Sequence, residues 1–96
     1  MNLKQIESKL SRNKKRLDGF GVKSLMVFGS VARSEEHKDS DIDILVEFNG
    51  PATFHGYMGL SEFLERLLGR KVDLVTTKAL REPLREGILR EAIRVA

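Results

Sequence analysis

The chain has 96 residues, of which 41% are hydrophobic and none is cysteine, and its formal net charge at pH 7 is +3. A chain of this length builds one core, so we expect a single domain over residues 1–96. The absence of cysteine excludes disulfides, thiolate metal sites and cysteine nucleophiles, so any metal must bind through oxygen or imidazole. Its apolar runs are far shorter than the roughly 20 residues that span a bilayer, and its N-terminus lacks the apolar core of a signal peptide, which predicts a cytoplasmic protein without membrane contact.

The first predicted element is one helix that ends before the turn at residues 18–21. Its apolar residues recur at helical spacing: Leu3, Ile6, Leu10 and Leu17. The same segment is crowded with basic residues: Lys9, Arg12, Lys14, Lys15 and Arg16. Such a run can attract phosphate or an acidic partner, but a solvated helix face is the more ordinary explanation.

Two strands with a short helical turn between them come next. Residues 22–28 are predicted as a strand, after which Ser30 is expected to cap the backbone amides that open the turn. The polar segment 34–40 is predicted as a loop. Residues 42–48 form the second predicted strand, which ends at Asn49-Gly50-Pro51.

The second half of the chain is predicted as helix, strand and helix. A core-facing stripe, ended by Gly69, marks the first of these helices: Leu60, Phe63, Leu64, Leu67 and Leu68. Residues 71–76 are the third strand. The closing helix has apolar residues at helical spacing: Leu84, Ile88, Ala92 and Ile93. The predicted order is therefore αβ(α)βαβα.

Two aspartates alternate at the start of the second predicted strand. Because successive side chains of a strand point to opposite faces, Asp41 and Asp43 share one face and Ile42 and Ile44 share the other. Like charges about 4 Å apart repel by roughly 4 kcal/mol at an effective dielectric constant of about 20. A divalent cation is the simplest remedy for this repulsion.

A Gly29-Ser30 turn and a third acid complete the candidate site. The turn ends a strand and opens a helical turn, so its backbone amides favour phosphate. Asp73 interrupts the third strand on the side away from the core. Three carboxylates suit Mg²⁺, with two ions expected once a nucleotide is bound. Each motif alone is weak evidence, but their combination is rare.

These residues resemble the signature of the DNA polymerase β-like nucleotidyltransferase superfamily, which is Gly-Ser, a loop, Asp-x-Asp and a later lone acid on a strand. Here the signature is Gly29-Ser30, ten intervening residues, Asp41-x-Asp43, and Asp73. The short length and the G-S-x-A-R opening are similar to the minimal nucleotidyltransferases (MNT), and the resemblance covers nearly the whole chain.

The resemblance implies an α+β fold with a mixed three- to four-stranded sheet flanked by helices. It also implies ATP as substrate and Mg²⁺ bound by the catalytic residues Asp41, Asp43 and Asp73. Many members of the group are antitoxins encoded beside HEPN-domain ribonuclease toxins, which they silence by transferring AMP to a tyrosine hydroxyl. We therefore expect ATP and a HEPN-domain toxin as partners. The sequence leaves open whether the protein forms homo- or hetero-oligomers.

Two further residues, Arg33 and Ser34, follow the turn closely in sequence. Arg33 is expected to bind nucleotide with Gly29 and Ser30, since its planar fork matches phosphate oxygens, although a surface arginine explains it equally well. Ser34 stands where family members usually have Gly. If this position needs a positive φ, nucleotide affinity should suffer.

Other side chains have ordinary explanations. Phe54, Tyr57 and Met58 are expected in the core, with stacking on adenine or contact with a partner as the alternative. His37 and His55 have no ligand spacing and are expected at the surface, His37 being the better candidate to touch substrate.

Several other functions are excluded or weaker. The chain has no G-x-x-x-x-G-K-[ST] P-loop, its Gly19-Phe20-Gly21 precedes a strand where a Rossmann turn would follow one, and no catalytic Ser-His-Asp or Cys-His set is present. An antitoxin that acts by binding alone is the main alternative to an enzyme. A small RNA-binding domain lacks interleaved aromatic residues, so nucleic acid is not expected as a direct partner.

Overall fold

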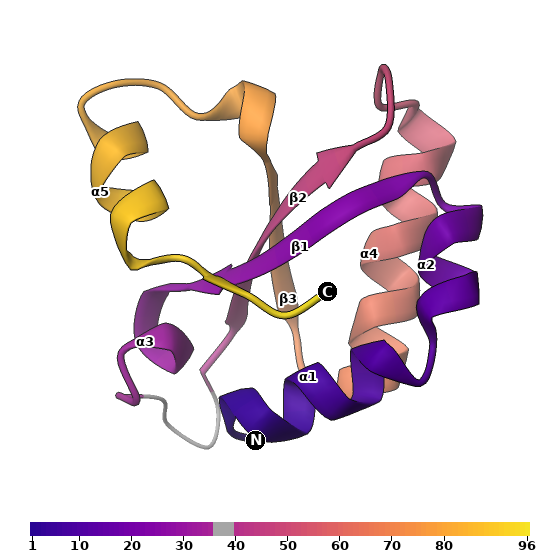
Figure 1. Cartoon of the computed structure of the whole chain (residues 1–96), viewed down its shortest axis with the longest axis horizontal. Coiled ribbons are helices and arrows are strands. Elements are labelled where there is room, and N and C mark those ends of the chain that lie inside the picture. The colour runs from indigo at the N-terminus through magenta and orange to yellow at the C-terminus, as the bar shows by residue number, and fades with distance from the viewer. Residues whose placement is uncertain (36–39) are drawn as a thin grey trace.

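The computed structural model describes residues 1–35 and 40–96. The helices are α1 (Leu3–Ser11), α2 (Lys14–Gly19), α3 (Gly29–Ala32), α4 (Phe54–Leu68) and α5 (Leu84–Glu91), with a short 3-10 helix η1 (Thr77–Ala79). The strands are β1 (Val22–Phe28), β2 (Ile42–Phe48), β3 (Val72–Thr76) and β4 (Ile93–Arg94). Figure 1 shows the helices arranged around the sheet.

The four strands form one mixed sheet in the order β3-β2-β1-β4. β1 is antiparallel to both β2 and β4, whereas β2 and β3 are parallel. This α+β architecture confirms the predicted fold class. None of the helices in the described part of the chain is long and apolar enough to cross a membrane.

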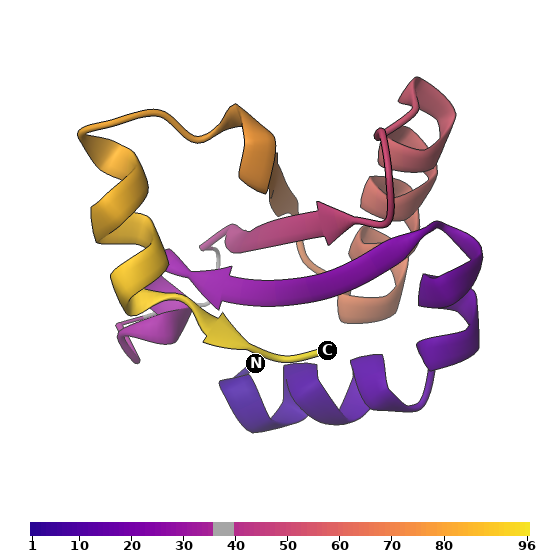
Figure 2. The ribbon, with the colours of Figure 1, turned by 45° about the horizontal axis from the view of Figure 1, so that its top comes forward.

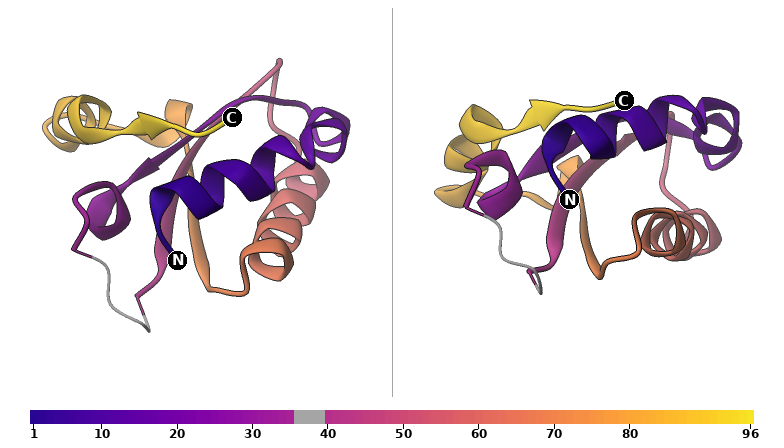
Figure 3. Two further views of the ribbon diagram at one scale, coloured as in Figure 1. Left: turned by 60° about the horizontal axis from the view of Figure 1, so that its bottom comes forward. Right: turned by 90° about the horizontal axis from the view of Figure 1, so that it is seen from below.

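The core lies on one face of the sheet. α1, α2 and α4 cover this face, while Figure 3 shows α5 on the other side of the sheet. The largest side chains of the core are fully buried: Ile6, Leu10, Leu25, Ile42, Ile44, Leu60 and Leu64. The other face keeps Met26, Asp43 and Asp73 outside this core cluster, so it is available for a site.

Helix α4 matches its prediction closely. The Thr53 hydroxyl accepts a hydrogen bond from the Gly56 amide (2.9 Å) at its start, and Gly69 ends it in the left-handed conformation with φ 66°. The Tyr57 hydroxyl donates to the Leu74 carbonyl of β3. This contact fixes the start of α4 against the sheet.

The opening helix is two helices, so the single helix predicted there was wrong. The chain breaks at Arg12-Asn13, where the Asn13 side-chain amide donates to the Lys9 carbonyl (2.8 Å). Asparagine competes with the helical backbone for hydrogen bonds in this way. Leu17 is nevertheless buried, because α2 turns back onto the same core.

The closing helix is shorter than predicted. It ends at Glu91, and Ile93 begins β4, which pairs with the free edge of β1. The edge offers hydrogen bonds that a continued helix would leave unmade, and the β-branched Ile93 and Val95 suit a strand. Figure 2 shows this C-terminal segment running beside β1 towards α1.

The prediction that Phe54 and Met58 pack in the core was also wrong. Their exposed fractions are 76% and 48%. Tyr57 continues the leucine stripe of α4 at helical spacing and packs against the core, whereas Phe54 and Met58 lie off this stripe. His55 lies at the surface as expected, while His37 lies outside the described residues.

Candidate nucleotide site

Asp43 and Asp73 lie side by side on the face of the sheet opposite the core. They are paired positions of the parallel strands β2 and β3, and their apolar neighbours Ile42 and Ile44 point into the core. Asp41 is exposed and stands one residue before β2. Because β1 ends at Phe28 opposite Asp43, the turn that follows β1 lies next to these carboxylates.

The charge of Asp43 is poorly compensated. Burial raises the pKa of this half-buried carboxyl, the neighbouring charges of Asp73 and Asp41 raise the pKa further, and Arg33 only partly opposes them. A bound cation would relieve this repulsion, and carboxylate oxygens are the ligands that Mg²⁺ prefers. The residues therefore fit a divalent metal.

The aspartates do not form a closed metal cage by themselves. Across residues 1–35 and 40–96, no three His, Asp or Glu side chains are grouped closely enough to hold a metal ion. Mg²⁺ commonly uses only one or two protein carboxylates and completes its shell with water and substrate phosphates. An open acidic edge is thus compatible with a metal that binds together with a nucleotide.

Gly29 brings the turn against Asp43. Its φ of 72° lies in the left-handed region, and a Cβ atom there would lie 2.1 Å from the Asp43 Oδ2 atom. Only glycine satisfies both conditions without strain. The close approach places the backbone at the start of α3 directly beside the central carboxylate of the site.

Ser30 does not cap α3 as predicted. The helix begins one residue earlier, at Gly29, its N-cap residue Phe28 has no side-chain acceptor, and Ser30 lies within it. The positive φ of Gly29 turns the chain directly into the helix, so no capping side chain precedes it. Ser30 remains at the opening of α3, where it is partly exposed.

A carboxylate that the sequence analysis missed contacts this turn. Glu91, at the end of α5, accepts hydrogen bonds from the Gly29 amide (3.0 Å) and from the Arg33 Nη1 atom (3.1 Å). These two donors lower the pKa of Glu91. Arg33 is thus an exposed side chain, as the ordinary explanation held, yet it is held beside Gly29. No local sequence pattern marks Glu91, because only the fold brings it to Gly29.

Ser34 adopts the positive φ that the sequence analysis raised as a condition. Its φ is 59°, which makes it the one non-glycine residue with positive φ among the described residues. The left-handed region costs an L-residue roughly 1–2 kcal/mol. The backbone after Arg33 is therefore one that glycine would adopt with less strain.

Replacing Ser34 by Gly is expected to raise the free energy of unfolding by about 0.5–1 kcal/mol, because it removes the steric cost at φ 59° while adding the backbone entropy of glycine. Urea unfolding measures this change. Ser8→Gly, in the middle of α1, is the matched control and should lower stability by about 0.5 kcal/mol. A loss of stability in Ser34→Gly would contradict the argument.

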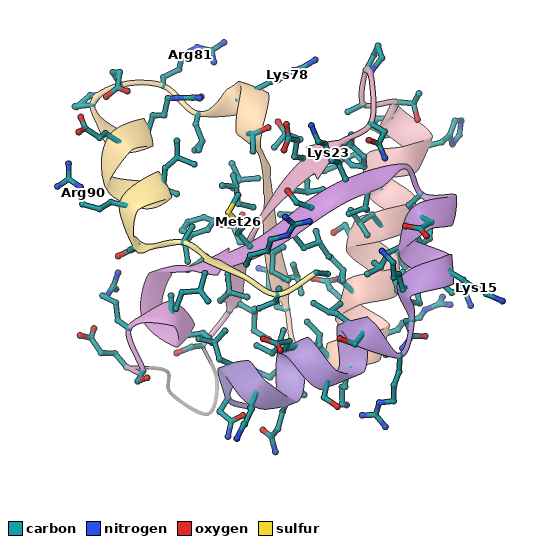
Figure 4. All side chains as sticks on the ribbon, in the orientation of Figure 1. Lys15, Lys23, Met26, Lys78, Arg81 and Arg90 are labelled. Atoms are coloured by element: carbon teal, nitrogen blue, oxygen red, sulfur yellow. The ribbon has the colours of Figure 1, made fainter. Side chains whose placement is uncertain are left out.

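A cavity of about 390 Å³ lies between the sheet and α5. Met26, which Figure 4 places in this space, and Leu89 give it an apolar wall, and Lys78 and Arg85 add positive charge. Glu47, another lining residue, is four positions after Asp43 on β2, or about 13 Å along the strand. None of the three aspartates is among its lining residues, so the cavity is separate from the acidic edge.

The basic residues of the N-terminal segment lie away from this site. The Arg16 guanidinium stacks on the Phe63 ring at 4.8 Å, and the Lys9 ammonium donates to the Leu67 carbonyl (3.2 Å), so both help to join the first helices to α4. Lys15 points outward (Figure 4). These contacts favour the ordinary interpretation of the basic run.

A mixed sheet with paired aspartates beside a Gly-Ser turn is the architecture of a nucleotidyltransferase. The chain belongs to the nucleotidyltransferase domain family, whose sequence model matches residues 3–95. It is 43% identical over 96 residues to the protein adenylyltransferase MntA of Thermococcus cleftensis, covering 99% of this chain and 97% of that protein.

Solved structures agree with this assignment. The chain is similar to a proposed minimal nucleotidyltransferase with 40% identity and a TM-score of 0.83, over 97% of this chain and 95% of that one. It also shares the fold of the MNT antitoxin structure with tri-AMPylated Shewanella oneidensis HEPN toxin, at 19% identity and a TM-score of 0.67, over 95% of this chain and 71% of that one. The resemblance seen in the sequence is thus confirmed, and the protein is a nucleotidyltransferase.

Proposed function

We propose that this protein transfers AMP from ATP to a tyrosine hydroxyl of a HEPN-family toxin in the cytoplasm, with Mg²⁺ as cofactor, and so acts as its antitoxin. The observation that carries the proposal is the pairing of Asp43 with Asp73 beside the Gly29 turn. The name of the Thermococcus cleftensis relative supports protein adenylylation. The MNT antitoxin that shares this fold was solved in complex with a tri-AMPylated HEPN toxin, which supports a HEPN toxin as the partner.

The aspartates are proposed to bind the metal, and the turn that follows β1 is proposed to bind the phosphates. Asp41, Asp43 and Asp73 would hold Mg²⁺, which supplies polarisation of the phosphate and a lower pKa for the attacking hydroxyl. The backbone at Gly29 and Ser30, together with Arg33, would bind and orient the triphosphate. The aspartates therefore act at the reacting phosphorus, and the turn positions the remaining phosphates.

The reaction is a displacement at the α-phosphorus. The acceptor oxygen forms a bond to this atom, and the bond from the α-phosphorus to the oxygen that bridges it to the β-phosphorus breaks. Pyrophosphate leaves with the bonding electron pair, and the hydroxyl proton is released. Because Asp41 and Asp73 are exposed and Asp43 is only half-buried, an acceptor side chain presented by another protein has access to them.

Incubating the protein with a HEPN-domain toxin, the proposed partner, is expected to label the toxin from ATP that carries ³²P in the α-phosphate. ATP labelled in the γ-phosphate should leave the toxin unlabelled, because that phosphate departs with pyrophosphate. EDTA should abolish the label and added Mg²⁺ should restore it, since the aspartates need a cation to accept the triphosphate. Label from γ-³²P ATP, or transfer in EDTA, would contradict the proposal.

The alternative is an antitoxin that neutralises its partner by binding alone. The specific observation in its favour is Ser34, whose positive φ is strained at the turn. Against it stands the repulsion among three aspartates, which a pure binding module has no physical reason to retain. Neutralisation of the toxin without any covalent label would establish this alternative.

A further inference from the structure

Helix α5 reaches the nucleotide site through one side chain. None of its residues is buried, and Leu84 is 71% exposed, so packing holds this helix only weakly. Its last residue, Glu91, contacts both the Gly29 backbone and Arg33. We propose that Glu91 is a positioning residue, which holds Gly29 and Arg33 in the orientation that receives the nucleotide phosphates.

The carboxylate bridges two parts of the turn. One oxygen accepts from the Gly29 amide (3.0 Å) and from Arg33 Nη1 (3.3 Å), and the other accepts from the same Nη1 atom (3.1 Å). Glu91, 62 residues from Gly29 in sequence, thus joins the first residue of α3 to Arg33, the residue directly after the end of α3. The bridge fixes the guanidinium relative to the backbone at Gly29.

Arg33 is held on a second edge as well. Its Nε atom donates to the Glu35 carboxylate (3.2 Å), so two carboxylates restrain the plane of the guanidinium. Within the described parts of the chain, the Nη2 atom has no hydrogen-bond partner. A fork restrained on two edges, with its third nitrogen available, is ready to bind a phosphate oxygen with little further loss of side-chain freedom.

Strand pairing sets the position of Glu91. Two residues later, Ile93 pairs with Val27 of β1, and the Val95 amide donates to the Leu25 carbonyl (2.9 Å). β1 leads directly into Gly29. Glu91 and Gly29 are therefore anchored at the same end of the same pair of strands, which makes their contact a property of the sheet and independent of the packing of α5.

The opposite role would be to block the site, because a carboxylate and a phosphate oxygen accept hydrogen bonds from the same donors. If Glu91 blocked the site, its removal would strengthen nucleotide binding. The contacts favour positioning, because Glu91 uses one amide of the turn and one nitrogen of Arg33 and leaves the Nη2 atom and the rest of α3 for phosphate. The two roles predict changes of opposite sign in KM.

The test compares two variants of Glu91 with a matched control. Glu91→Gln keeps an oxygen for the Gly29 amide but loses the charge and the second oxygen, whereas Glu91→Asp keeps the charge but is one methylene too short to bridge both donors. We expect each to raise KM for Mg-ATP about 5- to 20-fold and to change kcat by less than about threefold. Glu86→Gln, on the same helix and paired with Arg90 (2.9 Å), should match the wild-type protein.

This inference rests on the proposed function, but the two can fail separately. Calorimetry with Mg-ATP alone compares the Kd of each Glu91 variant with that of the wild-type protein and needs no acceptor. A protein that binds ATP yet labels no toxin would refute the proposed AMP transfer, and the role of Glu91 could still be tested. An unchanged or lower Kd and KM in Glu91→Gln would overturn the inference. A fall in kcat as large as the rise in KM, together with a lower melting temperature, would also overturn it. So would a wild-type protein that does not bind Mg-ATP.

Discussion

Replacing Asp43 by Asn is expected to abolish AMP transfer without unfolding the protein. Asp43 is the half-buried member of the acidic group that lies both opposite Asp73 and against Gly29, so a metal held between the aspartates and the turn depends on its carboxylate. Asn has nearly the same shape but no charge and only one acceptor oxygen. We expect transfer to fall by about three orders of magnitude or more, as measured by toxin labelling.

The same change should leave the folded state as stable or make it more stable. Burial and two like charges raise the pKa of Asp43 in the folded protein, which means that its ionised form is less favourable there than in the unfolded chain. Stability from this group is therefore lost as pH rises through the range where Asp43 ionises. Asn removes that cost, so urea unfolding at pH 7 should show no loss of stability.

Asp18→Asn is the control for the loss of one negative charge. Asp18 is exposed at the end of α2, away from the acidic edge, and its replacement should leave toxin labelling unchanged. Full activity in Asp43→Asn would refute the proposed role of the aspartates. A large loss of stability in that variant would instead refute our account of its electrostatics.

The first three strands and α4 could be predicted because their signals are local. Alternation in residues 42–48 and the leucine stripe that ends at Gly69 each depend on neighbouring residues of one element. The same alternation placed Asp73 on the side away from the core. That Asp73 lies beside Asp43 depends on the pairing of β2 with β3, which no local pattern reveals. The sequence suggested this grouping only because three acids together suit a metal.

The elements that could not be predicted depend on distant residues. Residues 92–96 read as the end of a helix, because nothing local reveals that β1 has a free edge for Ile93 to join. Glu91 becomes a site residue only through that pairing. Ser34 is an intermediate case, because the sequence identifies the position, but only the folded turn shows that its φ is positive.

Replacing Gly29 by Ala is expected to damage both stability and activity. The Cβ atom would lie 2.1 Å from the Asp43 carboxylate, and the φ of 72° is unfavourable for alanine in any case. The conformational cost is roughly 1–2 kcal/mol, and overpacking typically adds 1–3 kcal/mol. We expect a loss of about 2–5 kcal/mol in urea unfolding and at least a hundredfold loss in toxin labelling, since Asp43 must move.

A second glycine separates the two causes. Gly50 also has a positive φ, 83°, but a Cβ atom there would meet nothing within 4 Å, so Gly50→Ala should incur the conformational cost alone and keep full activity. The difference in stability between the two variants then measures the contact with Asp43. If Gly29→Ala lost no more stability than Gly50→Ala and still labelled the toxin, the turn would not press against the carboxylate. The backbone at Gly29 could then not be what places the phosphates beside Asp43.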